Sequence, residues 1–220
     1  MILAEPVFLS IQGEGPDSGK SMVFVRAKNC NLSCRYCDSK YTWGNEGEVI
    51  TIDMLISQIL NEDKHNCGRV YFTGGEPLLS RDIYGLVQKI KKLNYSITIA
   101  TNGTIKRPRW WYDVLWDVDC KCPSSGVKDI FNISWGCIGR KNRVKFVVSD
   151  EEDLKFVTDK VYELRKSPLC PTLLVSPMIP TNEDVILKPW LQRVWQFCTE
   201  NNLRFSFQVH KIVWGNRKGV

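Results

Sequence analysis

Three cysteines lie close together in the stretch "KNCNLSCRYCDSKYTWG", at positions 30, 34 and 37. Cysteine thiolates bind metal ions and iron–sulfur clusters, but a closed structural zinc site needs four ligands and disulfides need an even number of cysteines. An acid and a hydroxyl, Asp38 and Ser39, follow the last cysteine directly. The spacing therefore indicates either a zinc site completed by Cys120 or Cys122, or an iron–sulfur cubane with one iron left open for another ligand.

Two further polar motifs follow β-rich runs. The first is "VYFTGGEP" and the second is "TIATNGT". Glycines let the backbone approach a ligand closely, and an acid can pair with a ligand ammonium group. Taken alone, the first motif is equally compatible with an ordinary glycine turn, and "TNG" by itself indicates a turn. The candidate residues in the two motifs are Thr73, Gly74, Gly75, Glu76, Thr101 and Asn102.

Short β-rich runs alternate with helical patterns along the chain, which predicts βαβ units and a parallel sheet. A complete eight-unit barrel takes about 250 residues, so a chain of 220 residues favours a partial (truncated) TIM-like barrel of the α/β class. We expect one domain over 1–220. Strands are expected over 1–15, 21–27, 69–72, 96–100, 116–120, 143–148, 171–176 and 204–210, and helices over 51–60, 81–93, 151–166 and 188–200.

Composition narrows the class of protein. The nine cysteines occur without a secretion signal, which indicates a reducing cytosol and predicts a cytoplasmic protein. No run of eighteen apolar residues is present, so no membrane span is expected. The net charge of +6 is spread along the chain among acids, and an anionic small substrate accounts for it as well as nucleic acid does.

The C-x3-C-x2-C pattern, with the "GGEP" motif after the next strand, resembles the radical S-adenosylmethionine (SAM) superfamily. The resemblance implies a 4Fe-4S cluster on Cys30, Cys34 and Cys37. Its open iron would chelate SAM, whose reductive cleavage yields a 5′-deoxyadenosyl radical. The SAM contacts that the resemblance implies are Tyr36, Asp38, Gly74, Gly75, Glu76, Thr101, Asn102, Cys120, Lys121 and Cys122.

Four longer stretches resemble one family within this superfamily, the 7-carboxy-7-deazaguanine synthases. They are "SIQGEGPDSGKSMVFVRAKNCNLSC", "CDSKYTWG", "KCPSSG" and "FQVHKIVWGNRKGV". The resemblance implies conversion of 6-carboxy-5,6,7,8-tetrahydropterin to 7-carboxy-7-deazaguanine with loss of ammonia, as in queuosine biosynthesis, and Mg²⁺ bound at Ser39. The substrate contacts it implies are Ile11, Gln12, Gly13, Glu14, Arg26, Thr73, His210 and the terminal carboxylate of Val220.

Some of these roles also have a chemical rationale. The planar fork of Arg26 suits bidentate binding of the substrate carboxylate, although a strand arginine can equally point to solvent. Glu14 can accept two N–H donors from the amino-pyrimidinone edge of a pterin. Without the resemblance, Ser39 reads as a capping serine and His210 as a structural histidine.

We further expect a homodimer and an electron donor such as flavodoxin, with no direct contact to nucleic acid. Two alternatives stay open. A glycyl-radical activating enzyme of the same superfamily also carries three clustered cysteines. A zinc-bound nucleic-acid module would use the basic charge, but it would leave the "GGEP" motif unexplained.

Overall fold

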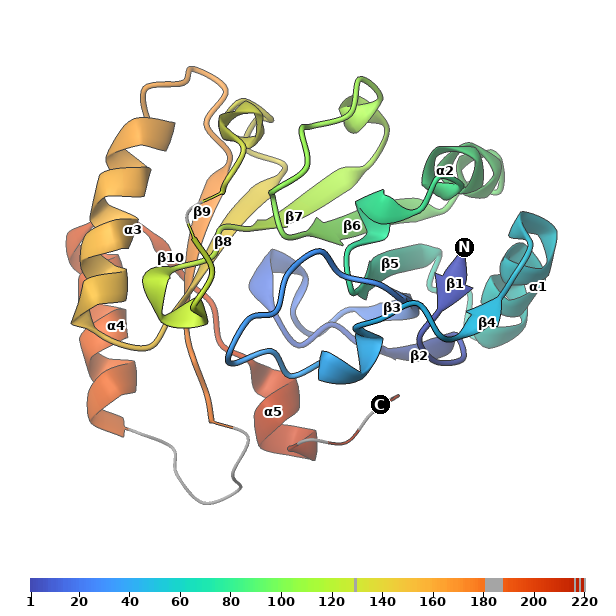
Figure 1. Ribbon diagram of the computed structural model, residues 1–220, viewed down its shortest axis with the longest axis horizontal. Coiled ribbons are helices and arrows are strands. Elements are labelled where there is room, and N and C mark those ends of the chain that lie inside the picture. The colour runs from blue at the N-terminus through green and yellow to red at the C-terminus, as the bar shows by residue number, and fades with distance from the viewer. Residues whose placement is uncertain (129, 181–187, 216, 218, 220) are drawn as a thin grey trace.

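The central feature of the fold is one curved, open sheet (Figure 1). The computed structural model describes residues 1–220 except 129, 181–187, 216, 218 and 220. Within these residues the strand order is β10-β9-β8-β7-β6-β5-β3-β1-β4, and β2 pairs with β3. The strands are β1 (Ile2–Leu3), β2 (Phe8–Ile11), β3 (Ser21–Ala27), β4 (Glu48–Val49), β5 (Arg69–Gly74), β6 (Ser96–Thr101), β7 (Leu115–Asp119), β8 (Arg143–Val148), β9 (Thr172–Pro177) and β10 (Arg204–Phe205).

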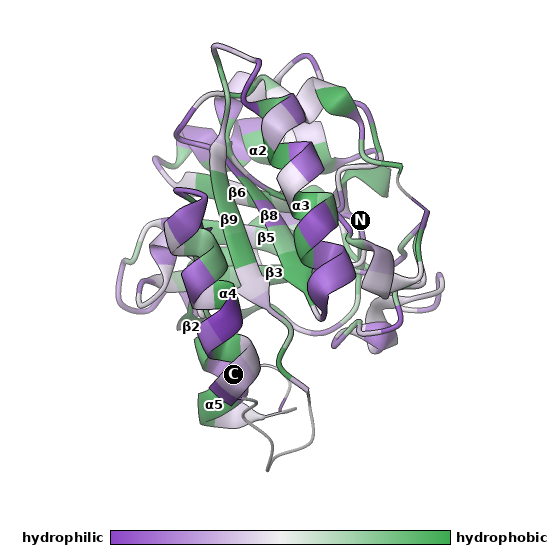
Figure 2. Cartoon of the chain, turned by 90° about the vertical axis from the view of Figure 1, so that its left-hand side faces the viewer, coloured by the Kyte–Doolittle hydropathy of each residue, from purple (hydrophilic) through white to green (hydrophobic). Residues whose placement is uncertain are grey.

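Helices cover one face of the sheet, and Figure 2 shows α3 and α4 on the side of the strands that faces the viewer. Thr51 caps α1 by accepting a hydrogen bond from the Met54 amide, and Asp150 caps α3 in the same way through the Asp153 amide. These caps fix where the two helices begin. The helices are α1 (Ile52–Glu62), α2 (Ile83–Lys92), α3 (Glu151–Leu164), α4 (Lys188–Glu200) and the short α5 (Val209–Trp214).

The parallel strands alternate between an apolar face and a polar face. On β7, Trp116 and Val118 are fully buried in the hydrophobic core, whereas Asp117 and Asp119 point to the opposite face. The helices therefore pack on the apolar face, and the polar face lines a cavity. The same alternation sets Val23, Val25, Val70, Phe72, Val144 and Phe146 in the core against Phe24, Arg26, Tyr71, Thr73 and Lys145 in the cavity.

The α/β class and the partial barrel are confirmed. From β3 through β5, β6, β7, β8 and β9 to β10 every pairing is parallel, as predicted. Residues before and after β3 add an antiparallel edge, in which β1 pairs with β3 and β4, and β2 pairs with β3. No helix in the described ranges is long and apolar enough to cross a membrane.

Two predicted strands were wrong in extent. The opening stretch forms the two separate strands β1 and β2, with Pro6 between them. The strand expected over 204–210 ends at Phe205, and His210 lies on α5. Ser206 and Gln208 leave the sheet because their side chains bond to the loop after β2, at Gly15 and Glu14. Tertiary contacts thus override the alternating pattern.

Candidate active site

A cavity of about 270 Å³ opens on the polar face, around the carboxyl ends of the parallel strands. Segments from both halves of the chain meet in it. The predicted site residues that line it are Ile11, Gln12, Gly13, Glu14, Arg26, Cys30, Cys34, Tyr36, Cys37, Asp38, Ser39, Thr73, Gly74, Gly75, Thr101, Asn102, Lys121 and His210.

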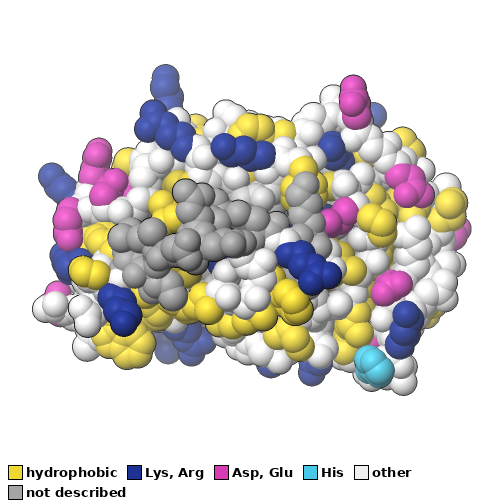
Figure 3. Space-filling view, turned by 90° about the horizontal axis from the view of Figure 1, so that it is seen from below, with side chains coloured by type: hydrophobic (Ala, Val, Ile, Leu, Met, Phe, Trp, Pro, Cys, Tyr) yellow, Lys and Arg dark blue, Asp and Glu magenta, His cyan; other side chains and the backbone are white. Residues whose placement is uncertain are grey.

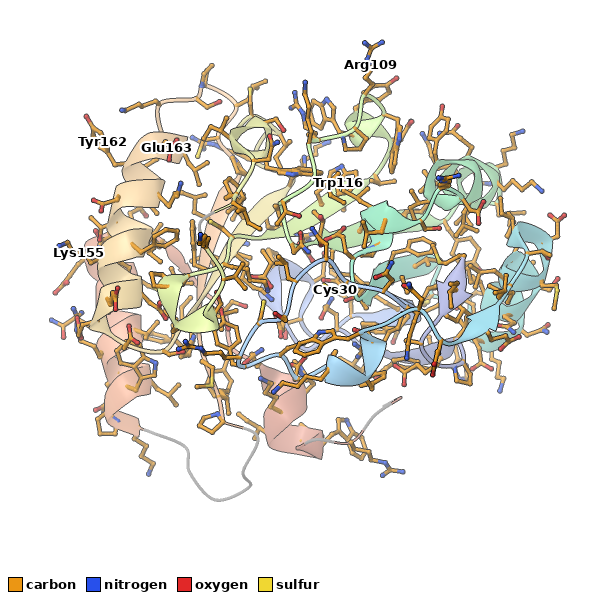
Figure 4. The ribbon with its side chains drawn as sticks, viewed as in Figure 1. Cys30, Arg109, Trp116, Lys155, Tyr162 and Glu163 are labelled. Atoms are coloured by element: carbon orange, nitrogen blue, oxygen red, sulfur yellow. The ribbon has the colours of Figure 1, made fainter. Side chains whose placement is uncertain are left out.

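The cysteine loop follows β3 and lies near the centre of the molecule, where Figure 4 labels Cys30. The "GGEP" turn holds the start of this loop through the backbone: the Gly75 amide donates to Ala27 O at 2.8 Å, and the Glu76 amide donates to Asn29 O at 2.8 Å. A Cβ on Gly75 would lie 2.0 Å from Asn29 O. Only glycine permits this close approach.

The far side of the cysteine loop rests on a short turn at Pro123–Ser125. The Arg35 amide donates to Ser125 O at 2.9 Å. That turn is in turn fixed by the fully buried carboxylate of Asp153, which accepts hydrogen bonds from the Ser124 amide at 2.9 Å and from Ser124 Oγ at 2.5 Å. Helix α3 therefore helps to position the loop between Cys34 and Cys37.

The three thiols fit an iron–sulfur cubane. Burial raises the pKa of Cys34, and the nearby Lys121 ammonium partly opposes this rise. Burial also raises the pKa of Cys37, so binding as thiolates would release protons from both. In the described part of the chain, no group of three or more His, Cys, Asp or Glu side chains is arranged to hold a single metal ion. A cubane instead takes each thiolate on a separate iron.

Two buried polar atoms beside the thiols have no hydrogen-bond partner among the described residues. They are the hydroxyl of Tyr36 and Oδ1 of Asp119, and both residues line the cavity. Buried polar groups are normally paired. An unpaired donor and an unpaired acceptor at this end of the cavity fit a polar ligand such as SAM.

At the other end of the cavity, Glu14 is a half-buried, ionised carboxylate. Lys145 Nζ lies 2.5 Å from its Oε2, and Gln208 Nε2 donates to its Oε1 at 2.8 Å. Burial opposes ionisation, but the Lys145 ammonium outweighs it and lowers the pKa of Glu14 to about 2. Burial alone would lower the pKa of Lys145, yet Glu14 and Asp119 raise it, so both groups are charged.

The loop that carries Glu14 packs against α5. The Val209 amide donates to Gly13 O at 3.0 Å, and a Cβ on Gly13 would lie 2.6 Å from His210 Nδ1. Burial lowers the pKa of His210, although Glu14 opposes this, and His210 Nε2 lies 3.9 Å from Glu14 Oε1. Residues near both ends of the described chain thus build one wall of the cavity.

Arg26 does not point to solvent. Its Nε forms an ion pair with Glu5 at 2.7 Å, and its guanidinium lies over the Phe8 ring at 5.7 Å from the ring centre. These contacts fix the side chain at the cavity wall. The arrangement is compatible with the expected contact to a substrate carboxylate, because a guanidinium has five N–H donors.

Asp38 and Ser39 form a small polar group beside the cysteines. Ser39 Oγ donates to Asp38 Oδ1 at 3.0 Å, and Lys211 Nζ lies 3.5 Å from Asp38 Oδ2. Burial opposes ionisation of Asp38, but Lys211 lowers its pKa overall. Ser39 lies at the N-cap position of a 3₁₀ turn without making a side-chain capping bond, so its oxygen is not used as a cap.

Three predicted residues, Glu76, Cys120 and Cys122, do not line the cavity. The carboxylate of Glu76 is 1% exposed and accepts hydrogen bonds from Thr101 Oγ1 at 2.9 Å and from the amides of Leu78 and Asn102. It fixes the ends of β5 and β6 rather than lining the cavity. Cys120 and Cys122 are fully buried in the core and do not line the cavity either. Val220 lies outside the described residues.

Sequence reasoning missed several polar residues that line the cavity, chiefly Asp119, Lys145, Gln208 and Lys211. A signal for two of them was present. Strands of a parallel sheet that is covered on both faces are nearly continuous in apolar residues, so a charge within "WDVDC" or "RVKFVV" indicates a polar face. Gln208 and Lys211 carried no such signal: Gln208 is uncharged within the expected strand 204–210, and Lys211 lies just after it.

Comparisons with known proteins identify the family of this chain. A model of the Radical SAM superfamily matches residues 24–185. A 7-carboxy-7-deazaguanine synthase from Thermoplasma acidophilum is 32% identical over 225 residues, covering 100% of both chains. Another from Clostridium acetobutylicum is 33% identical over 226 residues, covering 97% of this chain and 96% of its own.

The crystal structure of QueE from Escherichia coli matches the fold with a TM-score of 0.76 at 20% identity, covering 95% of this chain and 94% of that one. Members of the superfamily use a 4Fe-4S cluster and SAM, and the residues around the three cysteines fit both. The chain therefore belongs to the 7-carboxy-7-deazaguanine synthase family of the radical SAM superfamily.

Proposed function

We propose that this protein converts 6-carboxy-5,6,7,8-tetrahydropterin to 7-carboxy-7-deazaguanine with loss of ammonia. One observation supports this above the others: a single cavity carries three thiols at one end and the ionised Glu14 with the fixed Arg26 toward the other. The first set suits a cluster with SAM, and the second suits an anionic pterin. The names of the two synthases compared above agree with this reaction.

In this proposal the substrate lies between the "QGEG" loop and β3. Glu14 accepts the two N–H donors of the amino-pyrimidinone edge, and Arg26 donates to the carboxylate. Gln12 Oε1 already accepts from the Glu14 amide at 3.1 Å, which keeps the loop in shape for this contact. The other proposed substrate contacts are Ile11, Gly13, Thr73 and His210.

The cofactor end holds the cluster through Cys30, Cys34 and Cys37. When bound, the cluster and SAM supply one-electron reduction and hydrogen-atom abstraction from the substrate. Because Glu76 is enclosed by protein donors, we assign the contact of the "GGEP" turn to the backbone of Gly74 and Gly75. The remaining proposed SAM contacts are Tyr36, Asp38, Thr101, Asn102 and Lys121.

We also propose Mg²⁺ at Ser39. Its hydroxyl oxygen and the neighbouring Asp38 carboxylate are the oxygen ligands that Mg²⁺ prefers, and a substrate carboxylate and water would complete the shell. Lys211 beside Asp38 neutralises part of the negative charge. The affinity for Mg²⁺ would therefore depend on the substrate being bound.

We further propose a cellular location, an electron donor and an oligomeric state for this protein. Residues 1–220 would act as one cytoplasmic domain that receives electrons from a donor such as flavodoxin. A homodimer is favoured by exposed apolar residues on α5, and the face in Figure 3 carries hydrophobic side chains beside lysines and arginines. The exposed apolar residues of α5 are Val209, Ile212, Val213 and Trp214.

The test is an anaerobic assay of reconstituted enzyme with SAM, a reductant, Mg²⁺ and the carboxy-tetrahydropterin. We expect deazaguanine product from the wild type, and loss of iron and product in Cys34→Ala. Cys170→Ala is the matched control because this half-buried thiol does not line the cavity. An intact cluster without product would disprove the substrate and leave the glycyl-radical activating alternative. Zinc in place of iron would disprove the radical chemistry.

A further inference from the structure

Lys145 is a partly exposed cation in the cavity that none of the roles above uses. It lies on β8, with its side chain 20% exposed, and it points to the cavity between two carboxylates. Its Nζ lies 2.5 Å from Glu14 Oε2 and 3.9 Å from Asp119 Oδ2. A cation in this place could serve only to neutralise acids, or it could also contact the substrate.

We propose that Lys145 is a specificity-determining residue, which donates a hydrogen bond to the pterin carbonyl oxygen beside the two N–H groups that Glu14 accepts. The inference rests on the proposed function and deepens it. Glu14 and Lys145 together would contact three adjacent groups of the amino-pyrimidinone edge: the amino group, the ring N–H and the carbonyl oxygen. The carboxylate takes the two donors and the ammonium takes the acceptor.

The hydrogen-bond capacity of the two groups allows this. An ammonium has three donors, and among the described residues Lys145 makes one hydrogen bond, to Glu14; Asp119 at 3.9 Å lies beyond hydrogen-bond distance. Donors therefore remain for a ligand. A carboxylate has about four acceptor sites, and Lys145 and Gln208 each take one, on different oxygens. One site remains on each oxygen, as two parallel N–H donors require.

The backbone makes the position of Lys145 rigid. It belongs to β8, which pairs with β7 and β9 on either side, and its residue opposite on β7 is Asp119. Its neighbours along the strand, Val144 and Phe146, are fully buried on the other face of the sheet. A contact built on a central strand is held more accurately than one on a loop, and accurate placement is what discrimination between similar ligands needs.

Binding measurements with three stable ligands test the proposal. Pterin-6-carboxylate has the full edge. Its 4-thioxo analogue replaces the carbonyl oxygen by sulfur, a poor hydrogen-bond acceptor, and keeps both N–H donors, whereas its 2-oxo analogue replaces the amino donor by oxygen. Equilibrium dialysis is done anaerobically on reconstituted enzyme with SAM. We expect the wild type to bind pterin-6-carboxylate at least about 10-fold more tightly than either analogue, since a charged hydrogen bond is lost or weakened in each case.

Lys145→Gln should weaken binding of pterin-6-carboxylate about 10- to 100-fold and bind the 4-thioxo analogue nearly as the wild type does, so the preference for oxygen at that position disappears. Preference against the 2-oxo analogue should persist. The matched control is Lys89→Gln, which breaks an exposed ion pair with Asp53 between α1 and α2 and should leave all three affinities unchanged.

Equal weakening of all three ligands in Lys145→Gln would overturn the proposal, because it would mean that Lys145 only supports Glu14. Unchanged affinities would overturn it too. If the single variant fails to fold, the double variant Glu14→Gln with Lys145→Met removes both charges and leaves no unpaired ion in the cavity. This double variant should lose both ligand preferences. Retention of either preference would contradict the proposal. A wild type that binds none of the ligands instead overturns the proposed function itself.

Discussion

The two ends of the cavity are held in different ways. At the cysteine end, amides and carbonyls of separate loops bond to one another, and the closest contact is between Gly75 and the backbone of Asn29. At the substrate end, charged side chains do the same work, chiefly Glu14 and Lys145. Backbone hydrogen bonds persist when the pH changes but are lost when the backbone is displaced. Ion pairs accommodate small displacements but are lost when one partner changes its protonation state.

The largest effect is expected from Gly75→Ala at the cysteine end. The new Cβ would meet the Asn29 carbonyl at 2.0 Å, and because that atom belongs to the backbone, the loop must move. We expect loss of cluster incorporation and destabilisation of at least about 3 kcal/mol. Iron content and thermal unfolding measure this. Gly85→Ala on α2, which meets only a side-chain atom at 3.4 Å, should keep its iron.

Asp153→Ala should give the next largest effect, because it removes the acceptor of Ser124 and also of the Ser149 amide. Leaving buried donors unpaired costs about 1 to 3 kcal/mol each, so we expect roughly 3 kcal/mol in all. Denaturant unfolding measures the loss. Asp153→Asn keeps one acceptor and should recover part of it. Equal loss in both variants would mean that charge, and not hydrogen bonding, holds the turn.

The substrate end should respond to acid. The pKa of Glu14 lies at about 2 in the folded chain against 4.5 ordinarily, so its contribution to stability is complete above pH 4.5 and is lost as the pH falls toward 2. Each pKa unit is about 1.4 kcal/mol, which makes the contribution roughly 3 kcal/mol. Urea unfolding of the apoprotein at several pH values should show Glu14→Gln approaching the wild type in acid. A constant difference would contradict the ionic account.

The smallest effect is expected on the outer surface, away from both the backbone contacts of the cysteine loop and the ion pairs of the cavity. Lys89 and Asp53 form an ion pair at 2.6 Å on the outer helices, and both side chains are largely exposed. Such pairs contribute about 0 to 1 kcal/mol. Lys89→Gln should therefore unfold within 1 kcal/mol of the wild type by urea denaturation. A larger loss would show that the outer surface also contributes strongly to stability.

Much of the cysteine end could be predicted, because its residues come in contiguous motifs. The spacing of Cys30, Cys34 and Cys37 and the turn at Gly75 each lie within one short stretch. Strand ends were also predicted well, since β3 and β8 match the expected ranges residue for residue. Each of the two is a short run rich in β-branched and aromatic residues, which is a local signal for a strand.

The substrate end was predicted only in part. Glu14 was found, but its partners Lys145 and Gln208 lie 131 and 194 residues away along the chain. No local pattern relates residues so far apart, and only the pairing of β7 with β8 and the departure of the chain from β10 bring them together. No role was therefore predicted for Lys145 or Gln208, although both line the cavity.

The meeting of the "QGEG" loop with α5 has a consequence for synthesis. Gln208 leaves the ribosome long after Glu14, and at 5 to 20 residues per second the delay is about 10 to 40 s. The neighbours that hold the cysteine loop, up to Asp153, are all translated earlier. In a nascent chain the cluster-binding loop and its supports would therefore be complete before the substrate-binding wall. Cluster insertion can then begin before the enzyme is able to bind substrate.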